Sequence, residues 1–143
     1  MSRVADIRTS LEVGFDGAAL PARFARLRGR EWRSIAAAPE FPFEDGQFEV
    51  VILATGAVSR NAVRESHRVL RPDGRLFFTV PEKTGSQEGY ALPTVYSLVR
   101  DGFNIVGVER PKWRLFLRRG RTLTICAQKK NWRSASNRFR PYV

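Results

Sequence analysis

Apolar residues in this sequence gather in short runs that are separated by polar and turn-forming residues. Several of the runs are continuous rather than alternating, which is typical of strands that are covered on both faces. We predict six strands, at residues 11–15 (LEVGF), 31–36 (EWRSIA), 48–54 (FEVVILA), 74–80 (GRLFFTV), 103–108 (FNIVGV) and 122–128 (TLTICAQ).

Helical spacing of apolar residues occurs between the first two predicted strands. Gly29 can end this helix, because glycine readily adopts the backbone conformation found after a helix C-terminus. The apolar face of the predicted helix consists of Ala19, Leu20, Phe24 and Leu27.

A second helix is predicted from Ser59, which can act as its N-cap, to Leu70. The proline in residues 71–74 (RPDG) cannot continue a helix, so this segment predicts a tight reversal into the next strand. The predicted inner face of the helix consists of Ala62, Val63, Ser66 and Leu70.

A third helix is predicted from Leu92 to Arg100, and Gly102 can close it. Strands and helices then alternate along the chain until two strands follow one another at the end. Alternation requires crossover connections and therefore a mainly parallel sheet. We expect an α/β fold with a Rossmann-like sheet, helices on both faces and an antiparallel C-terminal edge strand.

The length of 143 residues is enough for one domain with a sizeable core. We expect an α/β domain over residues 1–128 and a basic tail over residues 129–143. The start, MSRVADIRTS, lacks the apolar segment of a secretory signal, and no apolar run reaches the length of a membrane span. We expect a soluble intracellular protein of the cytoplasm or an organelle matrix.

The net charge of +11 belongs entirely to the C-terminal quarter. Residues 110–143 contain 11 Lys and Arg and no acid, whereas the 14 basic and 14 acidic residues before them cancel. Such a block attracts polyanions, although it also fits a solvated basic edge. The candidate polyanion-binding residues are Arg114, Arg118, Arg119, Arg121, Lys129, Lys130, Arg133, Arg138 and Arg140.

Aromatic residues lie among these cations, at Trp113, Phe116 and Trp132 for example. Aromatic and arginine side chains together can stack on bases and hold phosphates. RNA or a ribonucleoprotein is therefore the first partner class, followed by an acidic protein and then by an anionic membrane surface.

The single cysteine and the single histidine offer no set of ligands for a structural metal. Cys126 lies in an apolar run and is predicted to be a small buried hydrophobe rather than a reactive thiol. His67 lies in a helical pattern and is predicted to be structural or on the surface. We predict neither a metal site nor an identifiable catalytic residue.

Two segments together resemble the class I S-adenosylmethionine-dependent methyltransferases. FPFEDGQFEVV (residues 41–51) is similar to the family's Leu-Pro-Phe turn and following strand, and ESHRVLRPDGRLFFTVPE (residues 65–82) is similar to its HRVL-like helix end, turn and strand. The resemblance covers roughly residues 11–130. It implies S-adenosylmethionine as cofactor and a seven-stranded doubly wound sheet with a reversed last strand.

Two alignments of the N-terminal part with this family are open. In one, EVGFDGA takes the place of the glycine-rich cofactor loop, so that Glu12 matches the family's acid and Gly14 a glycine, while Asp16 and Ala18 replace two other glycines. In the other, which fits better, Asp16 is the acid that ends the family's second strand and binds the ribose hydroxyls. The family's first strand and glycine loop are then absent.

Two more departures from the family pattern affect the implied cofactor site. Residues 36–38 are three alanines, and Ala37 stands near the place of the acid that binds the adenine amino group. The loop after the third predicted strand is short, which leaves Ala54, Thr55 and Gly56 near the carboxyl ends of the strands, where ligands of open α/β sheets bind.

These features favour a methyltransferase-like domain that has lost its cofactor chemistry and acts as a binding or structural protein. The alternative is a small active S-adenosylmethionine-dependent methyltransferase of unknown acceptor, and a third hypothesis has another subunit complete the sheet. With fewer strands than the family, the sheet must either close up, with residues 11–15 beside residues 48–54, or leave an edge open there.

Overall fold

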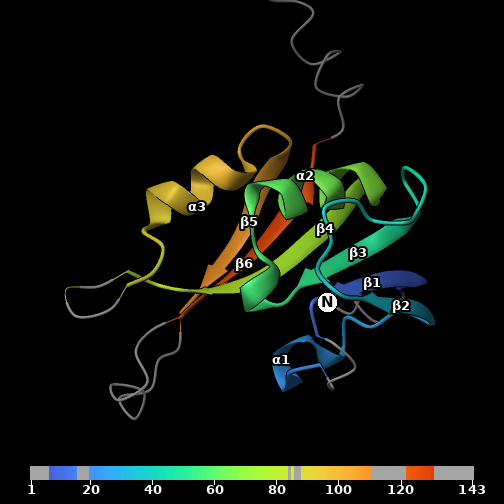
Figure 1. Cartoon of the computed structure of the whole chain (residues 1–143), viewed down its shortest axis with the longest axis horizontal. Helices are drawn as coiled ribbons and strands as arrows, with labels where there is room; N and C mark the ends of the chain where they lie inside the picture. The colour runs from blue at the N-terminus through green and yellow to red at the C-terminus, as the bar shows by residue number, and fades with distance from the viewer. Residues whose placement is uncertain (1–6, 16–19, 84, 86–87, 111–121, 131–143) are drawn as a thin grey trace, which may run out of the picture.

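The computed structural model describes residues 7–15, 20–83, 85, 88–110 and 122–130. Within these residues the chain forms one six-stranded sheet in the order β2-β1-β3-β4-β6-β5 (Figure 1). The strands are β1 (Thr9–Val13), β2 (Glu31–Ile35), β3 (Phe48–Leu53), β4 (Leu70–Pro81), β5 (Phe103–Glu109) and β6 (Thr122–Lys129).

The sheet is mixed in the way the strand pattern predicts. Strands β2, β1, β3 and β4 pair in parallel, whereas β6 is antiparallel to both of its neighbours. The C-terminal strand inserts between β4 and β5, so β5 forms that edge of the sheet. The expected Rossmann-like α/β fold with an antiparallel C-terminal strand is confirmed, and the described sheet has one strand fewer than the family's seven. The expected edge position of the C-terminal strand is wrong, because β6 pairs with β4 as well as with β5.

Helices cover both faces of the sheet, to different extents. Helices α2 (Arg60–Val69) and α3 (Leu92–Val99) lie on one side, and the short α1 (Ala22–Ala25) lies on the other, near β1 and β2 (Figure 1). The larger core lies under α2 and α3, and the smaller core joins two residues of the α1 segment, Phe24 and Leu27, to β3. No helix of the described chain is long and apolar enough to cross a membrane.

Helix α2 forms as predicted. The Ala62 N–H donates to Ser59 Oγ at 3.0 Å, so Ser59 is the N-cap. The chain leaves the helix at Leu70, which is already paired with Phe48 of β3. The predicted inner face is buried at all four positions, Ala62, Val63, Ser66 and Leu70.

The helix predicted to end near Gly29 is wrong in length, because α1 ends at Ala25. Gly29 lies directly against β1: its N–H donates to Ser10 Oγ at 2.8 Å, and a Cβ on it would stand 2.8 Å from the Arg8 carbonyl oxygen. The chain therefore has to leave the helix early in order to bring Gly29 to the strand. This tertiary contact overrides the helical spacing of the segment.

The tight reversal predicted at residues 71–74 is also wrong, because this segment belongs to β4. Between the pairs Phe48↔Leu70 and Val50↔Arg75, two residue steps on β3 correspond to five on β4. The extra residues form a bulge, in which Asp73 has a positive φ of 67°. The Pro-Asp-Gly sequence therefore bends the strand instead of reversing it.

The sheet closes up between β1 and β3. Strand β1 pairs with β2 on one side and with β3 on the other, with Val13 opposite Leu53. An open edge in the middle of the sheet, the outcome expected if another subunit completed it, is not found among the described strands.

Candidate functional site

The carboxyl ends of β1 and β3 lie in direct contact at the place where the resemblance puts the cofactor. Gly14 has a positive φ of 89°, and a Cβ on it would stand 2.8 Å from Ala57 Cβ and 3.2 Å from Ala54 Cβ. The Gly14 N–H donates to the Ile35 carbonyl at 2.8 Å, and the Ala54 N–H donates to the Val13 carbonyl at 2.9 Å. Gly14 therefore serves close packing between strand ends.

The predicted loop after β3 folds as a short 3₁₀ helix, η2 (Thr55–Ala57). Its Ala57 is buried beneath the loop, whereas Thr55 and Gly56 are exposed. No atom lies within 4 Å of a Cβ placed on Gly56, so nothing in the described chain requires a glycine there.

A cavity of about 310 Å³ lies beside η2 and brings two predicted site residues, Ala37 and Gly56, to the end of β1. Its polar side chains come from the start of α2. Ser59 caps the helix, and Asn61 Nδ2 donates to the Pro39 carbonyl at 2.7 Å. The lining consists of Val13, Ala37, Ala38, Pro39, Phe41, Gly56, Ala57, Ser59, Asn61 and Ala62.

This lining offers no ionic partner for the charged part of S-adenosylmethionine. The cofactor carries an ammonium group, a carboxylate and a sulfonium, and burying such charges requires ionic or hydrogen-bonding partners. None of the described lining residues has an ionisable side chain. The Ala37 side chain also has no acceptor for the adenine amino group. Asp16, the predicted ribose ligand, lies outside the described residues, and its role stays a prediction.

The acid of the first alignment, Glu12, has a structural partner. Its side chain is 1% exposed and accepts two hydrogen bonds from Arg28, at 2.6 and 2.8 Å. Hydrogen bonding to Glu12 raises the pKa of Arg28. The Arg28 guanidinium in turn lies 3.8 Å from the centre of the Trp32 ring. A buried carboxylate is thus neutralised by an arginine that is held between it and an aromatic ring.

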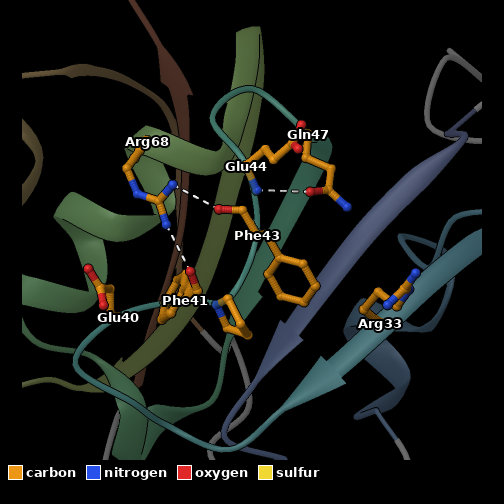
Figure 2. A pocket seen from close by; sticks show the side chains of 8 residues that line it. Arg33, Glu40, Phe41, Phe43, Glu44, Gln47 and Arg68 are labelled. Atoms are coloured by element: carbon orange, nitrogen blue, oxygen red, sulfur yellow. Dashed lines mark hydrogen bonds between the residues drawn. The ribbon is translucent and has the colours of Figure 1, made fainter.

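A wide groove of about 830 Å³ opens between β2 and the turn that begins at Phe41 (Figure 2). Arg33 of β2 lies on one side of it, and the phenylalanines of the turn lie on the other. The residues that line it are Arg33, Glu40, Phe41, Pro42, Phe43, Glu44, Gln47 and Arg68.

Arg68 fixes this turn to α2 (Figure 2). Its guanidinium donates to the carbonyls of Phe43 at 2.8 Å and Phe41 at 2.9 Å, and it forms ion pairs with Asp45 and Glu65 at 2.9 Å. The hydrogen bonds with the Glu65 and Asp45 carboxylates raise the pKa of Arg68, and the hydrogen bond from Arg68 lowers the pKa of Glu65. The two sequence segments that carry the family resemblance are therefore joined by one structural clamp.

A cleft of about 260 Å³, separate from the cavity and the groove, lies between α2 and the start of β5. His67 contributes to its wall and makes an edge-to-face contact with Phe103 at 5.3 Å. Its Nε2 is buried against Gly102 without a hydrogen-bond partner among the described residues. Burial, followed by the nearby Lys129 charge, lowers the pKa of His67. The predicted structural role of His67 agrees with this packing.

Two of the nine predicted polyanion-binding residues are described, and both bind the body of the domain. Lys129 Nζ donates to the Leu70 carbonyl at 2.7 Å, and Lys130 Nζ donates to the Arg100 carbonyl at 2.9 Å. Burial lowers the pKa of Lys129. The other seven, Arg114, Arg118, Arg119, Arg121, Arg133, Arg138 and Arg140, lie outside the described residues.

Cys126 is half-buried in β6, and burial is the main reason that its pKa is raised. A raised pKa keeps the thiol protonated at neutral pH, which agrees with the unreactive cysteine that the sequence predicts.

Two arginine interactions were not predicted from the sequence: that of Arg68 with the turn at Phe41, and that of Arg28 with Glu12. Glu65 and Arg68 are three residues apart on a predicted helix, and that spacing was a usable signal for an ion pair. The pairing of Arg28 with Glu12 had no local signal, because it depends on the path of the chain after α1.

Comparisons with known proteins agree with this architecture. A sequence profile described as a methyltransferase domain matches residues 4–78. The chain belongs to this methyltransferase-domain family. No curated protein sequence matches the chain.

Solved structures show the same fold at low sequence identity. A SAM-dependent methyltransferase from Methanosarcina mazei is 15% identical with a TM-score of 0.63, over 88% of this chain and 93% of that chain. The Burkholderia thailandensis 1,6-didemethyltoxoflavin-N1-methyltransferase, solved with S-adenosylhomocysteine, is 20% identical with a TM-score of 0.62, over 91% and 74%. The [4+2]-cyclase SpnF is 16% identical with a TM-score of 0.65, over 87% and 75%. The last of these has the fold under a name other than methyltransferase, so the fold alone does not fix the reaction.

Proposed function

We propose that this chain is a methyltransferase-like domain that has lost its cofactor chemistry and works as a binding protein for RNA or a ribonucleoprotein. The loss of cofactor chemistry is supported by the packing of Gly14 against Ala57, because a Cβ on Gly14 would stand 2.8 Å from Ala57 Cβ. At this strand end, side chains of the domain itself occupy the space beside the glycine. The cavity next to it has no ionisable side chain among its described lining residues.

The charge distribution supports the proposed binding of RNA or a ribonucleoprotein. Residues 110–143 combine 11 basic residues with no acid, and aromatic residues lie among them. Phosphate contacts by Lys and Arg release counterions from nucleic acid, and aromatic rings stack on unpaired bases. Lys129 and Lys130 bind backbone carbonyls of the domain, so the proposed RNA contacts come from the other basic residues of this quarter.

Calorimetric titration with S-adenosylmethionine and with S-adenosylhomocysteine tests the loss of cofactor chemistry. We expect no heat of binding and no shift in the melting temperature for either compound. Micromolar binding of either compound would overturn this half of the proposal. It would favour the alternative, an active methyltransferase of unknown acceptor, which family membership and the S-adenosylhomocysteine complex of the Burkholderia relative support.

RNA binding is tested by replacing Arg133, Arg138 and Arg140 with glutamine in the full chain. If the three residues contact phosphates of single-stranded RNA, the slope of log affinity against log salt should become shallower by about 2. A matched control replaces Arg8, Arg26 and Arg64, which are exposed and form no ion pair with another described residue. Its net charge falls equally, and its slope should stay near that of the unchanged protein.

Equal slopes for the two triple variants would contradict a specific role of the C-terminal quarter. Titrations with an acidic peptide and with anionic vesicles distinguish the other partner classes. Binding to either of them without binding to RNA would overturn the proposed partner. A deletion used in these assays should begin at residue 131, because Lys129 and Lys130 hold the end of β6 to the domain.

A further inference from the structure

Strand β2 forms one edge of the sheet (Figure 1). Its first four residues are exposed, and the Trp32 side chain is 45% exposed although it stacks on Arg28. An edge strand presents unpaired N–H and C=O groups, which can pair with another strand.

The printed hydrogen bonds show which backbone groups of β2 point outward. The Glu31 N–H donates to Arg8, and the Ile35 carbonyl accepts from Gly14, both at 2.8 Å. Alternate residues of a strand direct their backbone groups to the same side, so Glu31, Arg33 and Ile35 face β1. Trp32 and Ser34 therefore direct their N–H and C=O groups away from the sheet.

The side chains of β2 alternate between its two faces in the same register. Arg33 faces the groove of Figure 2, and Ile35 packs on the larger core on that side. Glu31 shares this face by alternation. Neither Glu31 nor Arg33 has an ion pair or a side-chain hydrogen bond with any other described residue. The edge thus has one acid and one base, two residues apart, both without partners in the described chain.

We propose that β2 pairs with β2 of a second copy of this chain, antiparallel and centred on Trp32. Two Trp32 residues would then exchange N–H to carbonyl hydrogen bonds, since both of their backbone groups point outward. Glu31 of each copy would lie opposite Arg33 of the other. In an antiparallel pair these neighbouring positions are the closer, non-hydrogen-bonded ones, which suits an ion pair across the strands.

The alternative centres fit this edge less well. A pairing centred on Arg33 would still join the outward backbone groups of Trp32 and Ser34, but it would place the two Arg33 side chains, which carry like charges, opposite each other at the closer position. A pairing centred on Ser34 would place Arg33 opposite Ile35 and leave Glu31 without a basic partner. Only the pairing centred on Trp32 joins outward backbone groups and opposite charges at once.

The side of β2 opposite the groove adds apolar contact to this pairing. The two Trp32 rings would lie next to each other there, each already held against Arg28. The contact is small because β2 has five residues, so we expect a weak dimer with a dissociation constant on the order of 100 μM. The proposal concerns neither the cofactor cavity nor the C-terminal quarter and does not depend on the proposed function.

Charge exchange on the full chain tests the register, with sedimentation equilibrium as the measurement. Arg33→Glu and Glu31→Arg alone should each weaken self-association by about tenfold or more, since like charges would then face each other. The double variant Glu31→Arg, Arg33→Glu should restore it. An equimolar mixture of the two single variants should form a heterodimer, because its facing charges are again opposite.

A backbone variant separates strand pairing from charge attraction. Ser34→Pro removes an outward N–H that makes no bond within the sheet, so the fold should remain while the dimer is lost. Melting temperatures of all variants show whether each one is folded. A wild-type chain that stays monomeric up to about 1 mM overturns the proposal. So do a folded Ser34→Pro variant that dimerises normally and a charge-exchanged double variant that stays monomeric.

Discussion

Gly14 and Ala57 lie so close together that a Cβ on residue 14 would stand 2.8 Å from the Ala57 Cβ. Gly14 directly follows β1, and Ala57 belongs to η2, which follows the neighbouring parallel strand β3. Their contact packs the carboxyl ends of the two strands together. In the first of the two alignments with the family, a glycine at this place gives a cofactor access to the backbone. In this chain, Ala57 of the 3₁₀ helix η2 fills the space that a side chain on residue 14 would need.

Gly14→Ala should destabilise the domain by about 3 kcal/mol, from the positive φ of 89° and the contact with Ala57. Urea unfolding measures the loss. Gly56→Ala is the matched control, because nothing lies within 4 Å of a Cβ there. Its effect should stay within about 0.5 kcal/mol. Equal stabilities for the two variants would show that the strand ends are not packed as described.

Arg28→Met should cost about 3 kcal/mol or more, because it leaves the buried Glu12 carboxylate without its partner. Replacing both residues, with Glu12→Gln added, should be less harmful than the sum of the two single changes. A double-mutant cycle by urea unfolding should therefore give a coupling energy of about 1 kcal/mol or more. Additive effects would mean that the two side chains act independently.

Arg68→Met should cost about 2 to 3 kcal/mol, because it removes charge-assisted hydrogen bonds to two carbonyls of the Phe41–Phe43 turn. Arg71→Met is a suitable control. Arg71 pairs with Glu49 at an exposed site, so its loss should cost less than about 1 kcal/mol. If the two variants lost similar amounts of unfolding free energy, the loss would come from removing a positive charge and not from breaking the hydrogen bonds of Arg68 to the turn.

The clamp also predicts a pH dependence in acid. Arg68 lowers the pKa of Glu65, so the stabilisation by Glu65 is present above its usual pKa and is lost as the pH falls through the lowered value. Urea unfolding from pH 6 to pH 3 should therefore show a steeper loss of stability for the wild type than for Glu65→Gln. Parallel curves would contradict the pairing.

His67 predicts a second, separate pH effect. Burial lowers its pKa, so the folded state favours the neutral ring, and stability should fall as the pH drops below about 6.5 and the unfolded chain takes up a proton. The nearby charge of Lys129 acts in the same direction. Because this is the only histidine, one NMR titration gives its pKa directly. A value at or above the ordinary one would contradict the burial of Nε2.

Features that depend on local chemistry could be predicted from the sequence. The capping of α2 by Ser59 needs only residues within one helical turn, and the buried face of that helix follows from its spacing. The mainly parallel sheet also followed, because alternating strands and helices require crossover connections. The resemblance implies one cofactor site for Ala37 and Gly56, and both residues line the cavity beside η2.

Features that depend on contacts between distant segments could not be predicted. The short α1 is set by Gly29 against β1, and β1 begins two residues earlier than predicted because Thr9 and Ser10 pair in the sheet despite their polarity. Ser10 is fully buried, with its hydroxyl bound to the Gly29 N–H. The spacing of apolar residues could not predict that Ser10 is buried with a hydrogen bond from a backbone group 19 residues away.

The insertion of β6 between β4 and β5 sets the order in which the domain can be completed during synthesis. Strand β5 is made before β6, yet its only strand partner in the described sheet is β6. Until Lys129 has left the ribosome, β5 has no strand to pair with and β4 keeps one bare edge. The nascent domain is therefore most exposed to misassociation while its last described strand is being translated.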